Sequence, residues 1–250
     1  MSEAASAAVL AAFAVFCRIG ACLMIMPGFS SARVPARVRL FVALAISLAA
    51  MPLLYDRLHI LLQDQSLSRL VSIMITESLI GIVIGLGARL FFLMLEMLAS
   101  TIAQAIGLAG IAGVPMEEGA GEATLVTFII MAATLLFFLA DLHLEVIRGL
   151  VSSYEVVPPG TGFPTRFSMS EMADALAGAS MLALRLSGPF IVLSVLVNFA
   201  FGLANKMTPM IQIYFAAMPV LIGLGFLLMM VLARPFLQGF IVGLQEFMVR

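Results

Sequence analysis

The chain has 250 residues, of which 63% are hydrophobic and 11% are charged, and its formal net charge is −1. Soluble domains are about 45 to 50% apolar and about 25% charged, so this composition indicates a membrane protein and excludes an ordinary soluble domain. The near-zero net charge gives no electrostatic basis for binding nucleic acid.

Six apolar stretches predict an all-α membrane protein: about 7–26, 38–54, 70–106, 123–151, 175–201 and 210–233. The first follows an N-terminus without the positive charges of a secretory signal, and we expect it to be retained. Cys17 and Cys22 lie within it, and their side chains diverge by about 140° on a helix, which favours apolar packing over a disulfide. The arginines and acidic residues of the connecting segments give no consistent topology by the positive-inside rule.

The stretch 70–106 is too long for one simple membrane crossing. A helix of this length extends roughly 56 Å at about 1.5 Å per residue, against a hydrocarbon core about 30 Å thick. Glu77, Arg89 and Glu96 lie in its interior, where lipid alone penalises each charge by about 2.5 to 3.5 kcal/mol or more. We expect these residues, together with Arg18 and Arg185, to find partners on neighbouring helices of this chain or of other subunits. A transporter would use such charges for ion coupling, whereas an assembly would use them to fix the register between helices.

Glycine and proline mark further positions along these stretches. Gly81 and Gly85 form one GxxxG step, and Gly239 and Gly243 form another, as at close helix contacts. Gly188-Pro189 and Arg234-Pro235 are expected to kink or break their helices. The short link 202–209 favours an antiparallel hairpin between the last two helices.

The segment 107–122 is rich in glycine, yet its first half is apolar, unlike an ordinary water-exposed loop. Such a segment can fold back as a plug across a lumen, or form a buried re-entrant turn without a gating role. The residues that we assign to a plug are Gly107, Gly110, Ile111, Gly113, Val114, Pro115 and Met116.

No catalytic motif for hydrolysis, nucleotide binding or metal-dependent proteolysis is present, so we do not predict an enzyme, and no cofactor is implied. Asp141, His143, Glu145 and Arg148 form one polar cluster. It fits a proton relay or metal site, or an ion-paired helix end near the membrane surface.

Three groups of motifs resemble the flagellar biosynthetic protein FliR family, which includes the SctT component of injectisomes. The first comprises Phe16-Cys-Arg18-Ile-Gly20, Met26-Pro27-Gly28-Phe29 and Val34-Pro35-Ala-Arg37-Val-Arg39. The second is Glu77-Ser-Leu-Ile-Gly81-Ile-Val-Ile-Gly85. The third is Asn198-Phe-Ala-Phe-Gly202-Leu-Ala-Asn-Lys206-Met-Thr-Pro209, continuing to Phe215 and Met218-Pro219. The family usually has arginine at the position of Lys206, and often Pro-Gln at Pro209-Met210.

The resemblance implies one membrane-embedded domain over 1–250, with a FliP-like part at about 1–170 and a FliQ-like helical hairpin at about 175–245. It implies a subunit of the type III export gate in the bacterial inner membrane and flagellar basal body. There it forms, with FliP and FliQ, a closed pore of stacked long helices for unfolded flagellar proteins. FlhB, FlhA, the MS-ring and lipid are further expected partners. The alternative is a small six-span secondary transporter in which intramembrane Glu and Arg residues couple ions.

Overall fold

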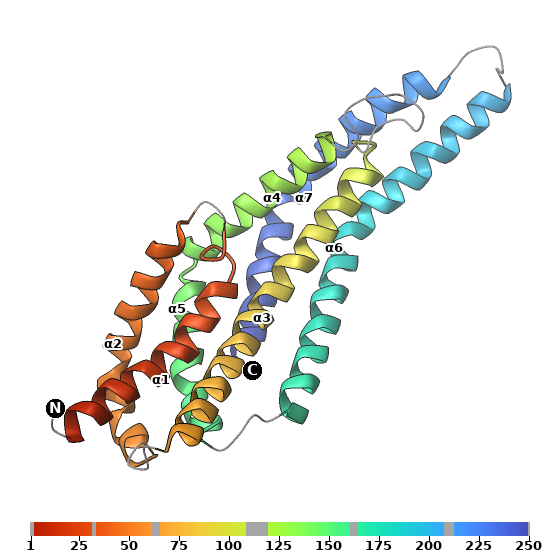
Figure 1. Ribbon diagram of the computed structural model, residues 1–250. Helices are drawn as coiled ribbons and strands as arrows, with labels where there is room; N and C mark the ends of the chain where they lie inside the picture. The colour runs from red at the N-terminus through yellow and green to blue at the C-terminus, as the bar shows by residue number, and fades with distance from the viewer. Residues whose placement is uncertain are drawn as a thin grey trace. The chain divides into compact units, whose positions relative to one another are not determined.

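The computed structural model describes residues 3–31, 34–61, 66–108, 120–160, 165–207 and 213–249, and these residues form helices joined by turns, with no strand among them. The helices, in chain order, are α1 (Glu3–Ile25), α2 (Ala36–Leu61), α3 (Leu67–Ala105), α4 (Ala120–Leu139), α5 (Leu142–Val156), α6 (Thr165–Met207) and α7 (Ile213–Val249) (Figure 1). In the described part of the chain, five helices are long and apolar enough to span a membrane, or six if the bent pair α4–α5 counts as one span. The prediction of an all-α membrane protein is therefore confirmed.

The chain divides into two compact units. The first contains residues 1–91, 141–176 and 247–250, so it holds α1, α2, α5 and the first part of α3. The second contains residues 92–140 and 177–246, so it holds α4, most of α7 and the remaining part of α3. The long helices α3 and α6 each contribute residues to both units.

In the first unit, α1 packs against α2 and against the first part of α3. The buried side chains of α5 are Leu142, Val146, Leu150 and Tyr154, spaced four residues apart along one face. This spacing places one apolar stripe toward the core and leaves the other face polar. The loop after α1 is held by Arg39, whose Nε and Nη2 donate to the Val34 carbonyl oxygen at 3.0 and 2.9 Å.

In the second unit, aromatic rings join three helices. The ring of Phe92 on α3 meets Phe137 on α4 and Phe240 on α7 edge to face, with centroids 6.0 and 5.5 Å apart. Gly239 of α7 faces Leu182 and Leu186 of α6, which a Cβ added at Gly239 would meet at van der Waals distance. These contacts place α6 and α7 together, as expected for a hairpin.

The end of α3 is set by Gly107, whose φ of 83° is in the left-handed region that favours glycine. The Gly107 N–H donates to the Gln104 carbonyl oxygen at 3.0 Å, and the Leu108 N–H donates to that of Ala103 at 2.9 Å. This pair of bonds is a Schellman motif, which satisfies carbonyls that the helix end leaves open. The 39-residue α3 confirms the overlong helix predicted at 70–106.

One sequence prediction requires correction. The stretch 123–151 is not one helix, because Asp141 takes a left-handed conformation with φ 55° and separates α4 from α5. Aspartate tolerates that conformation better than most residues, so no glycine or proline marked the break. Of the two outcomes expected at Pro189 and Pro235, a kink or a break, the break does not occur: α6 and α7 each continue as one bent helix (Figure 1). The bend accommodates the missing proline N–H without ending the helix.

Replacing Gly81 by alanine is expected to lower the thermal stability of the detergent-solubilised protein. A Cβ at Gly81 would overlap the Arg18 carbonyl group, so α1 and α3 would have to separate, at a cost of about 1 to 3 kcal/mol. The matched control is Gly149→Ala on α5, where nothing lies within 4 Å of the added Cβ. Gain of helix propensity should leave that variant unchanged or more stable. Equal melting temperatures for both variants would contradict the close α1–α3 contact.

Candidate functional site

One face of α3 forms the contact with α1. Glu77, Gly81, Gly85 and Arg89 follow one another at intervals of four residues, so they lie on the same side of the helix. A Cβ at Gly81 would meet the Arg18 carbonyl, and one at Gly85 would lie 2.7 Å from the Cys22 carbonyl oxygen. Glycine at both positions therefore lets the two backbones touch. Since later residues of α3 meet later residues of α1, the two helices run in the same direction.

This close approach brings the Arg18 side chain onto Glu77, one turn before Gly81. Arg18 Nε donates to Glu77 Oε2 at 2.6 Å, and Nη2 donates to Oε1 at 3.0 Å. Both side chains are fully buried. The two parallel bonds form the bidentate geometry in which a guanidinium and a carboxylate pair most strongly.

Three residues at the end of α5 complete the surroundings of Arg18. Its Nη1 donates to Ser153 Oγ at 2.9 Å, and its Nη2 donates to the Val157 carbonyl oxygen at 3.2 Å. The guanidinium carbon lies 3.7 Å from the ring centroid of Tyr154, which is a cation–π contact. Val157 is the C-cap of α5, so the arginine charge also faces the negative end of the helix dipole. We call Arg18, Glu77, Ser153, Tyr154 and Val157 the buried charge cluster; it ties α1, α3 and α5 together.

The other three charged residues expected to find partners on neighbouring helices are exposed in this chain. Arg89 donates from Nη1 to Ser30 Oγ at 3.3 Å, in the loop that follows α1. Glu96 and Arg185 are also exposed, and no described residue bonds to either of them. No described helix covers Glu96 or Arg185, so of the two expected sources of partners this chain's described residues supply none for them. Cover by other subunits stays a prediction.

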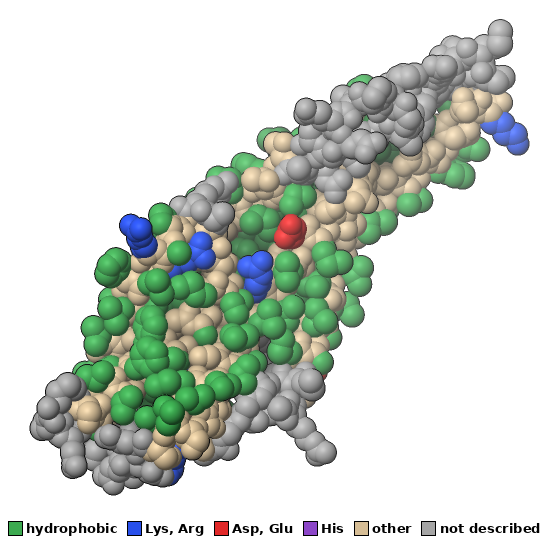
Figure 2. Space-filling model, viewed as in Figure 1, with side chains coloured by type: hydrophobic (Ala, Val, Ile, Leu, Met, Phe, Trp, Pro, Cys, Tyr) green, Lys and Arg blue, Asp and Glu red, His purple; other side chains and the backbone are tan. Residues whose placement is uncertain are grey.

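The surface around these charges is mostly apolar. Figure 2 shows hydrophobic side chains spread over the visible face, with few charged groups between them. On α3, Leu93 and Met97 flank Glu96 and are themselves exposed. On α6, Leu184 beside Arg185 is 64% exposed. These helices therefore carry isolated charges on faces that are otherwise suited to lipid or to protein.

The remaining family-motif residues occupy varied environments. Gly20 and Pro27 are buried in the first unit, whereas Pro35 and Arg37 are exposed around the start of α2. Asn198 is exposed and donates to the Ser194 carbonyl oxygen at 2.8 Å. Gly202, Lys206 and Pro219 are exposed, and Pro209 lies outside the described residues. These positions do not converge on a single site.

Most of the predicted plug lies outside the described residues. Gly107 is described and ends α3, whereas Gly110, Ile111, Gly113, Val114, Pro115 and Met116 are not. In the polar cluster at α5, Arg148 pairs with Glu145 across one helical turn, and both side chains are largely exposed. No group of three metal-ligating side chains occurs among the residues that the structure describes.

The sequence analysis does not identify the three neighbours of Arg18 at the end of α5, which are Ser153, Tyr154 and Val157. The predicted apolar stretch ends at 151, whereas α5 continues to Val156. A signal did exist, because Tyr154 continues the four-residue spacing of Leu142, Val146 and Leu150. Nothing in the sequence indicates that this turn meets Arg18.

Comparison with known proteins gives a consistent result across the chain. The family model described as "Bacterial export proteins, family 1" matches residues 9–247. A relative from Caulobacter vibrioides, named flagellar biosynthetic protein FliR, is 33% identical over 84% of this chain and 83% of its own length. Proteins of the same name from Escherichia coli and Bacillus subtilis are 28% and 23% identical. They align with 88% and 87% of this chain, and with 84% and 83% of their own lengths.

Removing one member of the buried ion pair is expected to be much worse than removing both. Glu77→Ala leaves Arg18 buried without its anion, which costs about 3 to 5 kcal/mol. Replacing both residues by leucine removes the uncompensated charge, and most of the lost stability should return. The control is Glu145→Ala, because that pair is exposed and contributes about 1 kcal/mol or less. The measurement is thermal unfolding in detergent, and additive losses in the double variant would contradict the pairing.

Proposed function

Since the chain belongs to family 1 of the bacterial export proteins, and within it to the FliR proteins of flagellar biosynthesis, we propose that it is a subunit of the flagellar type III export gate. The family makes it a component of flagellar protein export, and its apolar helices make it a membrane protein of that apparatus. The gate would pass unfolded flagellar proteins across the inner membrane. This subunit would perform no covalent chemistry.

The observation that carries the proposal is the length of three helices. α3, α6 and α7 contain 39, 43 and 37 residues. At about 1.5 Å per residue, they extend roughly 56 to 65 Å, about twice the thickness of a bilayer's hydrocarbon core. Lipid cannot cover such helices along their whole length unless they tilt strongly. Apolar helices that project beyond the bilayer require other proteins to cover them, as in a stacked helical gate.

The expected partners follow from the family. FliP and FliQ would complete a closed pore with this chain, and FlhB, FlhA and the MS-ring would adjoin it. The division into a FliP-like part at about 1–170 and a FliQ-like hairpin at about 175–245 stays a prediction. The contact of α6 with α7 through Gly239 supports the hairpin.

The transporter alternative loses support from the buried charge cluster. A coupling carboxylate must exchange its ion or proton during transport, as intramembrane acids do in transporters. Both oxygens of Glu77 are bonded to Arg18, and both side chains are fully buried. This arrangement fits a fixed structural pair that sets the register of α1 against α3.

Loss of this chain from a flagellated bacterium is expected to abolish secretion of hook and filament proteins, because no complete gate would form. The readout is flagellin in the culture medium by immunoblot, together with swimming in soft agar. A plasmid copy of the chain should restore both, which controls for effects on neighbouring genes. Normal flagellin secretion without the chain would contradict the proposed function.

Deleting residues 110–116 is expected to make the assembled gate leak, because the apolar, glycine-rich segment that we assign to the plug would be removed. The measurement is ion conductance or small-solute uptake in cells or proteoliposomes that contain the assembled complex. A deletion of residues 62–65, between α2 and α3, is the control. Normal assembly without leakage would refute the plug assignment and leave gate membership intact.

A further inference from the structure

Along one face of α6, residues follow one another at alternating steps of three and four, and no described residue of the chain covers this face. We call this face the outer seam; it consists of Gly178, Met181, Arg185, Gly188, Val192, Val195, Phe199, Gly202 and Lys206. Every member is exposed except Gly188, which is half-buried. The opposite face carries the buried residues Ala179, Ser187 and Phe190 and meets α7. As far as Phe190, α6 thus has one covered face and one open face within the second unit, and beyond Phe190 no described residue of α6 is buried.

The spacing of the outer seam indicates the kind of partner that fits it. Residues that alternate at three and four positions repeat every 3.5 residues, which is the pattern by which one α-helix packs along another in a left-handed pair. Gly178, Gly188 and Gly202 have nothing within 4 Å of an added Cβ, so another backbone can approach closely at these points. Small residues at such positions promote helix contacts in membranes.

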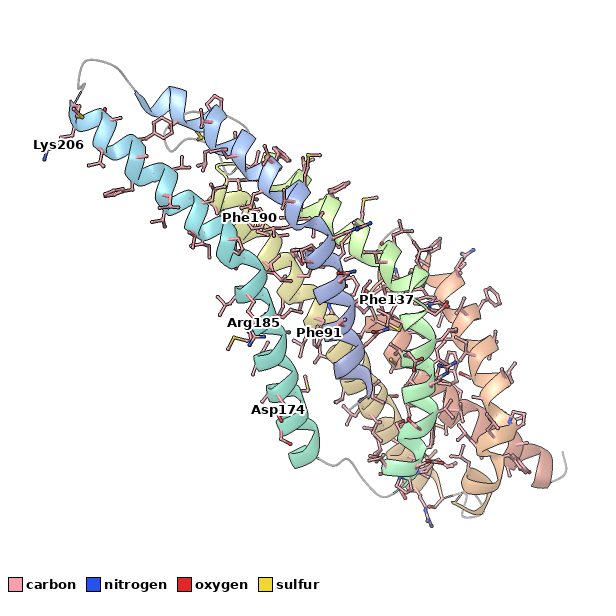
Figure 3. All side chains as sticks on the ribbon, turned by 180° about the vertical axis from the view of Figure 1, so that it is seen from behind. Phe91, Phe137, Asp174, Arg185, Phe190 and Lys206 are labelled. Carbon is pink, nitrogen blue, oxygen red and sulfur yellow. The ribbon has the colours of Figure 1, made fainter. Side chains whose placement is uncertain are left out.

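A charge in the middle of the outer seam indicates the chemistry of that partner. Arg185 lies between the apolar seam residues Met181 and Val192, and no described residue bonds to it. In Figure 3, Arg185 and Lys206 both project from α6 away from the other helices. The proline at 189 also lacks the N–H that would bond the Arg185 carbonyl oxygen, which lies four residues earlier in the helix.

Arg185 lies inside the apolar span of α6 and away from both of its ends. The span runs from Met172 to Met207, so Arg185 lies 13 residues from one end (185 − 172) and 22 from the other (207 − 185). These distances are roughly 20 and 33 Å along the helix. Because α6 is longer than the hydrocarbon core is thick, protein as well as lipid must cover this span. A carboxylate on a neighbouring helix would neutralise Arg185 wherever this part of α6 lies.

We propose that the outer seam binds one transmembrane helix of another export-apparatus subunit, and that this helix carries an aspartate or glutamate opposite Arg185. The inference rests on the proposed function, because it takes the other subunit to be part of the same apparatus. It adds the face that is used, the helical form of the partner and the sign of its charge. Arg185 then fixes the register of the two helices, as a polar residue does within a heptad pattern.

Site-specific photo-crosslinking in the assembled complex tests this inference. The photoreactive residue p-benzoyl-phenylalanine replaces Phe199, an outer-seam residue that is 66% exposed. The matched control is Ala200, which is also exposed but is rotated by about 100° around the helix. Crosslinks at 199 are expected to exceed those at 200 by about tenfold. Mass spectrometry should map them to one helix of an export-apparatus subunit that carries a carboxylate.

Charge variants then test the role of Arg185. Arg185→Lys should retain the crosslink at 199, whereas Arg185→Glu should reduce it by about tenfold or more through like-charge repulsion. Reversing the charge of the mapped carboxylate together with Arg185→Glu should restore the crosslink. This double variant keeps the test informative if Arg185→Glu alone prevents assembly.

Several results would overturn the inference. They are equal labelling at 199 and 200, crosslinks to lipid alone, crosslinks to a second copy of this chain, or no effect of Arg185→Glu. The proposed function fails separately if the chain copurifies with no export-apparatus subunit. An intact complex in which position 199 labels no partner helix refutes the outer seam and leaves gate membership standing.

Discussion

A fully buried arginine requires an anion at a fixed place, and in this chain the anion is Glu77. The pair forms because Gly81 and Gly85 let α1 and α3 touch, which puts Arg18 within reach of a carboxylate one turn earlier on α3. The end of α5 supplies the remaining acceptors through Ser153 and Val157. Sliding either helix by one turn, about 5.4 Å, would leave two buried charges unpaired. The interaction therefore sets the register of the first unit.

The second unit is held together differently, by apolar contacts instead of a buried ion pair. Its core includes the aromatic contacts of Phe92 and the approach of α6 to α7 at Gly239, with no buried ion pair among the described residues. Its charged residues Glu96 and Arg185 lie instead on exposed faces of very long helices. Such charges are unfavourable in lipid and useful between subunits. The buried charges of the first unit are thus paired within the chain, whereas the exposed charges of the second unit are available to pair with other subunits.

Composition and periodicity predicted the all-α membrane class, the overlong α3 and the close contact at Gly81 and Gly85, since each depends on local pattern. The break at Asp141 is not predicted, because a single residue in the left-handed conformation does not change the hydropathy of an apolar stretch. Of the five charged residues expected to find partners, Arg18 and Glu77 are buried and pair within the chain, whereas Arg89, Glu96 and Arg185 are exposed in it. Sequence shows that a charge lies in an apolar helix, but only tertiary packing decides which face is covered. The partners of Arg18 on α5 lie more than 130 residues away along the chain, beyond the reach of any local pattern.

The central claim is that this chain is an export-gate subunit whose long helices are completed by other proteins. Native mass spectrometry of the tagged chain, expressed with and without the FliP and FliQ proteins of the same genome, tests it most directly. The account predicts a discrete complex that contains this chain and several partner copies, and poor recovery of the chain alone. A stable monomer or homodimer that ignores both partners would contradict the account.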